Sequence, residues 1–212
     1  MPLTIMGGGG GSGSTPPPAF RINSFTNNKP INEMGVALSS VSFDWSYTNG
    51  SPISQSIAPI VGSMATGDRS YNLTGQNIMN DMTFTLTASD GTTTRTQTTV
   101  VRFFWPLFVG LVSSDTPIES EILAMEKKIA GATSFLQNYT INDQRCAIAI
   151  HNSVPQLSDV KETVFNMSVL SEFNKFTGIP VTTSAGIENY TVYIWKVLQN
   201  TSGLPQPLNF IW

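Results

Sequence analysis

The stretch that decides the fold is residues 82–104, which read MTFTLTASDGTTTRTQTTVVRFF. Its apolar positions Met82, Phe84, Leu86 and Ala88 alternate with threonines. A period of two is typical of a β-strand with one buried and one wet face. Asp90-Gly91 is a strong hairpin signal, and the residues after it are rich in β-branched side chains. The stretch therefore predicts two antiparallel strands joined by a tight turn.

Similar strands extend from this hairpin toward the N-terminus. Val41, Phe43, Trp45 and Tyr47 alternate with polar residues, and Asn49-Gly50 then predicts a turn. Weaker strand patterns cover residues 20–26, 53–61 and 71–73. About seven short strands separated by regular turn signals favour an immunoglobulin-like sandwich over residues 20–105, held by packing and centred on Trp45.

A second domain is expected over residues 106–212. The segment 103–109 is the most apolar of the chain and suits a polypeptide that leaves one sandwich and enters another, buried on both faces. A helix of about 14 residues is predicted over 117–130, packed on a sheet. Its signals are Thr116 as N-cap, Pro117 at N1, Glu119 at N3, Gly131 as C′ stop, and an apolar stripe of Ile118, Ile122, Met125 and Ile129.

Strands are predicted again after this helix. Residues 134–141 and 145–151 are expected to form a hairpin across Asn142-Asp143, while 158–166 can be read as a short helix. Residues 190–198 are apolar on both faces, which suits a central strand or one buried between protomers. The alternating aromatic C-terminus, residues 208–212, is expected to pair into a sheet. The whole pattern predicts an all-β protein: an immunoglobulin-like sandwich followed by a second β-sandwich-like domain with one short α-helix.

Residues 1–19 form a low-complexity arm. A glycine run at 7–11 favours flexibility, and Pro16, Pro17 and Pro18 favour a stiff, extended segment. Such a segment cannot build a core, so it is a disordered tail, a linker left from cloning, or an arm that threads into a neighbouring subunit. It does not resemble a phosphate-binding loop, because no strand precedes it and the required Lys is missing.

Composition narrows the function classes. Of 212 residues, 11 are Lys or Arg and 14 are Asp or Glu, so the net charge is −3 and argues against a broadly basic nucleic-acid binder. One Cys excludes an internal disulfide, and one His excludes a histidine metal cage. No apolar run approaches the roughly 20 residues needed to span a bilayer, and the first residues do not resemble a secretory signal. We expect no cofactor, metal, nucleic-acid or membrane partner.

Catalytic constellations are not predicted. Cys146 and His151 are five residues apart, so on one strand they face opposite sides; the Cys is expected to be a core residue and the His a polar strand end. The carboxylates Asp44, Glu119, Glu121, Asp159 and Glu162 are scattered rather than paired. The sequons at Asn49, Asn72, Asn138, Asn166, Asn189 and Asn200 fit the abundance of Asn, Ser and Thr. A carbohydrate platform of Tyr139, Tyr190, Tyr193 and Trp195 is an alternative to core or interface packing.

Several short motifs resemble those of a domain found in structural proteins of tailed bacteriophages. They are INSFTNN at 22–28, EMG at 33–35, VSFDW at 41–45, YNLTG at 71–75, MTFTLTASDG at 82–91 and FWPLFVG at 104–110, with QRCAIAI at 144–150 and NYTVYIW at 189–195 in the second half. The resemblance covers most of the chain and implies a virion component with an immunoglobulin-like module, without catalytic residues.

The resulting hypothesis is a non-enzymatic structural protein of a virion, in the tail, baseplate or fibre, that forms a homo-oligomer and contacts other virion proteins. The alternatives are a head decoration or head-fibre protein and a receptor-binding adhesin tip that holds a host surface glycan; an enzyme is the weakest reading. The residues predicted to make assembly contacts are Gly7, Gly8, Gly9, Gly10, Gly11, Pro16, Pro17, Pro18, Phe104, Trp105, Phe108, Tyr193, Trp195 and Trp212.

Overall fold

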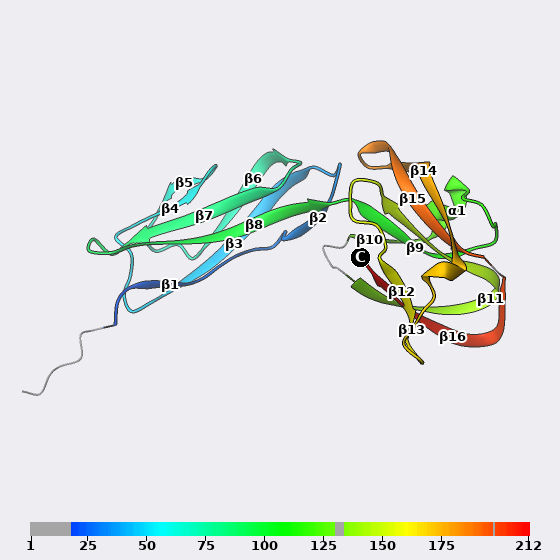
Figure 1. The fold of residues 1–212 in the computed structure, drawn as a ribbon. Coiled ribbons are helices and arrows are strands. Elements are labelled where there is room, and N and C mark those ends of the chain that lie inside the picture. Colours follow the sequence, from blue (N-terminus) through cyan, green and yellow to red (C-terminus); the bar gives the residue numbers. More distant parts are fainter. Residues whose placement is uncertain (1–17, 130–133, 197) are drawn as a thin grey trace, which may run out of the picture.

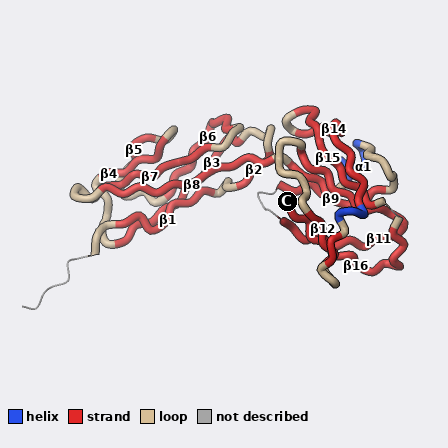
Figure 2. The backbone as a smooth tube through the Cα atoms, in the orientation of Figure 1, coloured by secondary structure: helices blue, strands red, loops and turns tan. Residues whose placement is uncertain are grey.

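The computed structural model describes residues 18–129, 134–196 and 198–212. Strands dominate it, which confirms the predicted all-β class, and they gather into two bodies joined by one crossing of the chain (Figures 1 and 2). The predicted arm lies outside the described residues except for Pro18 and Ala19, which are exposed.

The first body is a sandwich of two sheets. One sheet has the order β1 (Arg21–Asn27), β3 (Leu38–Thr48), β6 (Ser70–Ile78). The facing sheet has the order β2 (Ile31–Glu33), β8 (Thr94–Phe104), β7 (Met82–Ser89), β4 (Ser54–Ala58), β5 (Gly62–Met64). If β1, β3 and β6 correspond to strands A, B and E, then β4, β7 and β8 correspond to C, F and G, which is the immunoglobulin arrangement.

The core of this sandwich is apolar and aromatic. Phe43 and Phe84 face each other from opposite sheets with ring centroids 4.7 Å apart. Trp45 is 3% exposed, as predicted, and its Nε1 donates to Oε1 of Gln55 at 3.2 Å. It lies on β3, which corresponds to strand B, whereas antibody domains carry their core Trp on strand C. The hairpin turn at Asp90 is also confirmed: its carboxylate accepts from the backbone N–H of Thr92 and Thr93.

The second body also has two sheets, which share one long strand. The first sheet has the order β10 (Glu126–Ile129), β9 (Pro106–Val112), β11 (Ser134–His151), β15 (Gly186–Trp195), β14 (Phe173–Thr183). The second has the order β11, β16 (Gln199–Ile211), β12 (Asp159–Glu162), β13 (Met167–Ser168). A 3-10 turn, η1 (Leu170–Glu172), precedes β14.

Strand β11 corrects the predicted hairpin at Asn142-Asp143. The chain does not reverse there: residues 134–144 pair with β16, and residues 145–151 continue as the strand between β9 and β15. The register shifts on both sides of Asn142, and Asp143 has a φ of 51°. The turn-forming residues therefore let one strand change sheets instead of folding back on itself.

The helix is shorter than predicted and starts later. Helix α1 covers Glu119–Ala124, its N-cap is Ile118 with no side-chain cap, and neither Thr116 nor Pro117 has the predicted role. Residues 126–129 form β10 on the edge of β9, so pairing with a neighbouring strand outweighs the local helical pattern. The side chain of Met125 packs where Gly110 leaves room, because a Cβ on Gly110 would lie 2.9 Å from it. The predicted stop at Gly131 lies outside the described residues.

Strand β15 is an interior strand of its sheet and lies between β11 and β14. Tyr193 and Trp195 pack between the two sheets, and Val192 and Ile194 pack on the opposite face, where α1 covers the sheet with Ile122. Pairing of the C-terminal aromatic strand is confirmed too, since β16 lies between β11 and β12. The helical reading that the sequence left open at 158–166 is not what the structure shows: these residues form β12 and a turn.

Candidate functional site

The two bodies meet at one residue of linking chain. β8 ends at Phe104, β9 begins at Pro106, and Trp105 lies between them. The Trp105 ring stacks on the imidazole of His151, with centroids 3.8 Å apart and planes 9° from parallel. The Tyr190 hydroxyl donates to the Pro106 carbonyl at 3.0 Å. The crossing is thus fixed to strands β11 and β15 of the second body.

His151 is held on every side. It ends β11, as predicted for a polar strand end, and is buried. Its Nδ1 lies 2.7 Å from the Ser153 hydroxyl, and its Nε2 lies 3.3 Å from Oε2 of Glu188. The Tyr190 ring meets the imidazole edge-on at 5.3 Å. These contacts place the imidazole between Trp105, the turn at Ser153 and strand β15.

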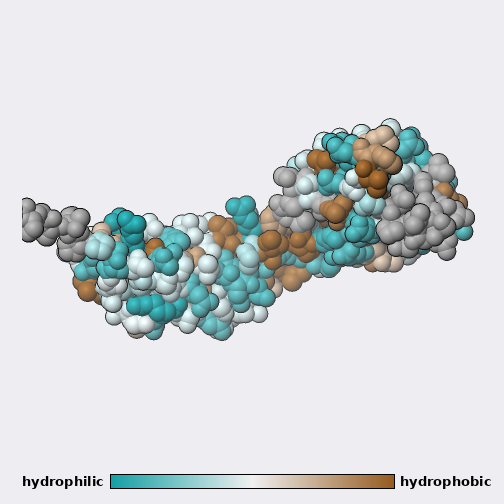
Figure 3. Space-filling view, turned by 90° about the horizontal axis from the view of Figure 1, so that it is seen from below, coloured by the Kyte–Doolittle hydropathy of each residue, from teal (hydrophilic) through white to brown (hydrophobic). Residues whose placement is uncertain are grey.

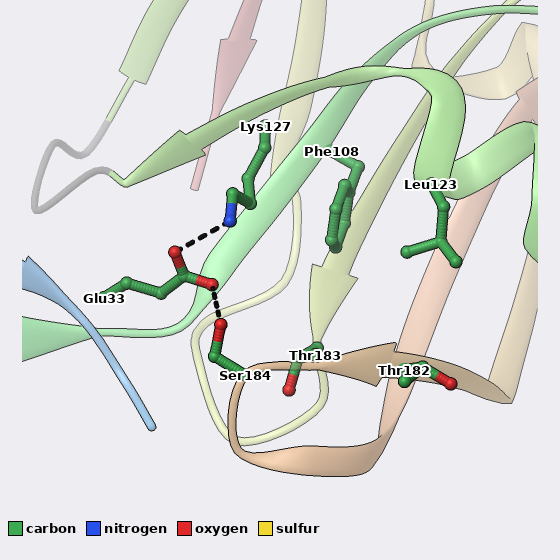
Figure 4. Close-up of a pocket in the computed structure, with 7 residues that line it drawn as sticks. All are labelled: Glu33, Phe108, Leu123, Lys127, Thr182, Thr183 and Ser184. Carbon is green, nitrogen blue, oxygen red and sulfur yellow. Dashed lines mark hydrogen bonds and ion pairs between the residues drawn. The ribbon is translucent and has the colours of Figure 1, made fainter. Parts of the chain in front are cut away.

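A second connection centres on Glu33, the last residue of β2. Strand β2 pairs in parallel with the end of β8, so Glu33 lies beside the crossing. Lys127 of β10 is 2.8 Å from Oε2 of Glu33, and the Ser184 hydroxyl donates to Oε1 at 3.0 Å (Figure 4). One carboxylate of the first body therefore binds two segments of the second, β10 and the turn between β14 and β15.

Gly35 lies against that same turn. Its φ is +85°, and a Cβ there would come within 2.3 Å of the Ala185 nitrogen. Only glycine allows the two backbones to approach this closely at this conformation. We call the contacts of Trp105, Glu33 and Gly35 with the second body the joint.

A pocket opens beside the joint. It has a volume of about 370 Å³ and is lined by Glu33, Phe108, Leu123, Lys127, Thr182, Thr183 and Ser184. Phe108 and Leu123 point into it from one side, and the end of β14 lies across from them (Figure 4). Its floor is apolar and its rim carries hydroxyls and one ion pair. This arrangement can receive an apolar group, and its Ser184 hydroxyl is hydrogen-bonded to the Glu33 carboxylate at the rim.

The carboxylates of the second body support its loops. Glu119 of α1 accepts from the Thr182 N–H at 2.8 Å, and hydrogen bonds from Thr182 lower its pKa. Glu121 accepts from the Ser113 N–H at 3.0 Å and from the Ser114 hydroxyl. Burial alone would raise the pKa of Glu121, but these hydrogen bonds lower it on balance. Both carboxylates thus tie α1 to neighbouring segments.

Cys146 is a core residue, as predicted. It is buried between the two sheets of the second body, while His151 lies on the opposite face of β11. Burial raises the pKa of the thiol to about 12, so it stays protonated at neutral pH. The described geometry brings these two side chains to different sides of one sheet.

The structure separates the residues predicted to make assembly contacts. Phe104 and Trp105 are half-buried at the joint, and Trp212 is half-buried against the core between the sheets. Phe108, Tyr193 and Trp195 are buried in the core of this chain, and Phe108 also lines the pocket beside the joint. Tyr139, Tyr190, Tyr193 and Trp195 are all buried, which fits core packing and not the alternative of a carbohydrate platform. The glycines at 7–11 and Pro16 and Pro17 lie outside the described residues; Pro18 is exposed.

Sequence reasoning missed most of the joint. Glu33 and Gly35 belong to the quoted EMG motif, but nothing local marks Lys127 or Ser184 as their partners. In the part of the chain that the structure describes, no group of three His, Cys, Asp or Glu side chains could hold a metal ion. The described helices are also too short to cross a membrane.

Comparison with known proteins adds no further assignment. No family model, no curated protein and no solved structure matches the chain.

Proposed function

We propose that this chain is a non-enzymatic structural component of a bacteriophage virion, in the tail, baseplate or fibre, and that it assembles through its N-terminal arm and its β-domains. The observation that carries the proposal is the joint. Together, Glu33, Gly35 and Trp105 contact three segments of the second body, namely β10, the turn between β14 and β15, and the end of β11, which fixes one sandwich relative to the other. A part that transmits position between neighbouring subunits needs such a fixed relation.

Surface composition supports the same role. Charged residues make up 12% of the chain, about half of the usual proportion. Charge is costly to desolvate, and the centres of protein interfaces are depleted of it. A weakly charged surface therefore suits a protein that is covered by neighbours in an assembly.

The head-decoration alternative shares all of these features and differs only in location. The adhesin alternative is less well supported, since the aromatic residues on which it depended are buried.

Particle assembly tests the proposal. Particles made with the full chain and particles made without it are compared by electron microscopy, and the chain is located on the particle with gold-labelled antibody. We expect label at the tail end and defective tails when the chain is missing. Label on the capsid would support the head alternative. A chain that is absent from purified particles, or that releases sugars from polysaccharide or peptidoglycan with turnover, would contradict the proposal.

A further inference from the structure

The hairpin between β12 and β13 ends in an exposed apolar tip. Val164 is 69% exposed, Phe165 75% and Met167 58%. The hairpin projects from the second body on the side away from α1 and the β14–β15 hairpin (Figure 1). Figure 3 looks onto that side and shows apolar surface on the second body. Grouped exposed apolar side chains are typical of an interaction site.

The tip is held in one shape. Both oxygens of the Glu162 carboxylate accept backbone hydrogen bonds, from the N–H of Val164 at 2.6 Å and of Phe165 at 2.8 Å. Asn166 turns the chain with a φ of 56°, and the Thr163 N–H donates to the Pro207 carbonyl at 3.2 Å. A fixed apolar knob loses little conformational freedom on binding, so it is preorganised to bind in a pocket of matching size.

The chain itself contains such a hollow in the pocket beside the joint. A cavity of about 150 Å³ can hold benzene in a protein interior. The pocket, at about 370 Å³, therefore has room for the Phe165 ring and part of a neighbouring side chain. The apolar pocket residues Phe108 and Leu123 suit the Phe165 ring. The hydroxyls of Thr183 and Ser184 lie at the rim, and the tip brings no charged residue to them.

The tip points away from α1 and the β14–β15 hairpin (Figure 1), and those elements carry the pocket residues Leu123, Thr183 and Ser184, so a chain cannot fill its own pocket. A lipid membrane is the other apolar environment into which such a tip could insert. Membrane-binding loops gain from basic flanks, whereas the flanks here carry Asp159, Lys161 and Glu162, one positive charge against two negative.

We propose that the tip of one copy, centred on Phe165, inserts into the joint pocket of the next copy. The contact is head-to-tail, so repetition gives a closed ring or an open filament. It deepens the proposed function by naming the surface through which the homo-oligomer forms. A chain found in particles that does not self-associate through these surfaces would overturn this inference and leave the proposed function intact.

Two singly defective variants test the direction of the contact. Phe165→Ser removes the knob, and Leu123→Glu places a charge in the pocket; both residues are exposed, so folding should persist, as circular dichroism and melting will check. Ile53→Ser, an equally exposed apolar residue of the first body, is the matched control. Self-association is measured by analytical ultracentrifugation over increasing protein concentration.

We expect the wild type and the Ile53 variant to form dimers and larger species, with association weakened by about tenfold or more in each of the other two variants. An equimolar mixture of Phe165→Ser and Leu123→Glu should form a dimer that grows no further, because one intact tip meets one intact pocket. A monomeric wild type would overturn the proposal. So would a Leu123 variant that associates normally, which indicates tip-to-tip pairing, or a mixture that stays monomeric.

Cysteine pairing gives a second readout that does not depend on those variants. Val164→Cys in one copy, which keeps Phe165, and Thr183→Cys in another should form an intermolecular disulfide on mixing, while buried Cys146 stays unreactive. Cross-linking no faster than that of a Thr183→Cys and Ile53→Cys mixture would contradict the proposed contact.

Discussion

Trp105, on the link between the two bodies, and His151, at the end of β11 in the second body, stack face to face with ring centroids 3.8 Å apart. Trp105 is the single residue between the last strand of the first sandwich and the first strand of the second. The stack fixes the direction in which the chain crosses. Together with the Glu33 contacts, the stack fixes the position of the first body relative to the second.

Gly35→Ala tests the joint. The new Cβ would come within 2.3 Å of the Ala185 nitrogen, so the two bodies must move apart. We expect a changed solution-scattering profile and a loss of stability beyond the roughly 1 kcal/mol that an Ala at positive φ costs. Gly75→Ala is the matched control: its φ is +70° and nothing lies within 4 Å, so it should show the backbone cost alone. Equal behaviour of the two variants would count against a close-packed joint.

Trp45→Ala tests the core of the first sandwich. Removing this ring leaves a cavity and deprives Gln55 of a hydrogen-bond donor, so unfolding free energy should fall by ~3–5 kcal/mol. Chemical denaturation measures the loss. Tyr71→Ala, at a more exposed site of the same sandwich, should change stability much less. A Trp45 variant that unfolds at the wild-type denaturant concentration would place the ring outside the core.

Glu121 should make folding stability depend on acid. Its pKa is lowered in the folded protein from 4.5, so its contribution is complete above about that pH and is lost as pH falls further. Glu121→Gln should therefore flatten the decline of melting temperature on acidification below that pH. Asp44→Asn serves as the comparison variant. If the Glu121 variant loses stability with the wild-type profile, the carboxylate is not the group that ties α1 to Ser113 and Ser114.

Cys146 should resist thiol reagents while the protein is folded. Burial raises its pKa from 9.0 to about 12, which disfavours the reactive thiolate. We expect labelling at pH 8 only after denaturant is added, at the rate of global unfolding. Because the folded pKa is raised, stability from this site should decline as pH rises above 9. Rapid labelling of the native protein would show that the core between the two sheets is open.

The arm offers a prediction about assembly. Removing residues 1–19 should leave the melting temperature of both bodies nearly unchanged, because the first residue buried in the described structure is Phe20. Incorporation into particles should fail. Normal incorporation of the shortened chain would show that the arm does not anchor it.

Local patterns predicted the strands well because alternation reports burial directly. The hairpin at Asp90 and the core position of Trp45 follow from such short-range signals. The pattern at 190–198 left a central strand and an intersubunit strand equally open, since both bury two faces. In the structure, residues 190–195 belong to an interior strand between β11 and β14, and Tyr193 and Trp195 pack between the two sheets.

Long-range pairing explains the errors. Residues 126–129 have a helical pattern, but the free edge of β9 makes them a strand. Asn142-Asp143 has a turn signal, but β16 and β9 keep β11 extended on both sides of it. The joint was hidden for a similar reason: Lys127 and Glu33 are 94 positions apart, and neither position has a pattern that names the other.

The most direct test of the central claim is a cryo-electron microscopy map of the intact particle whose genome encodes this chain. The account predicts density at the tail end that fits both β-bodies in the fixed relation set by Glu33, Gly35 and Trp105, with neighbouring subunits around them. A map of complete particles in which no density fits the two bodies would contradict it.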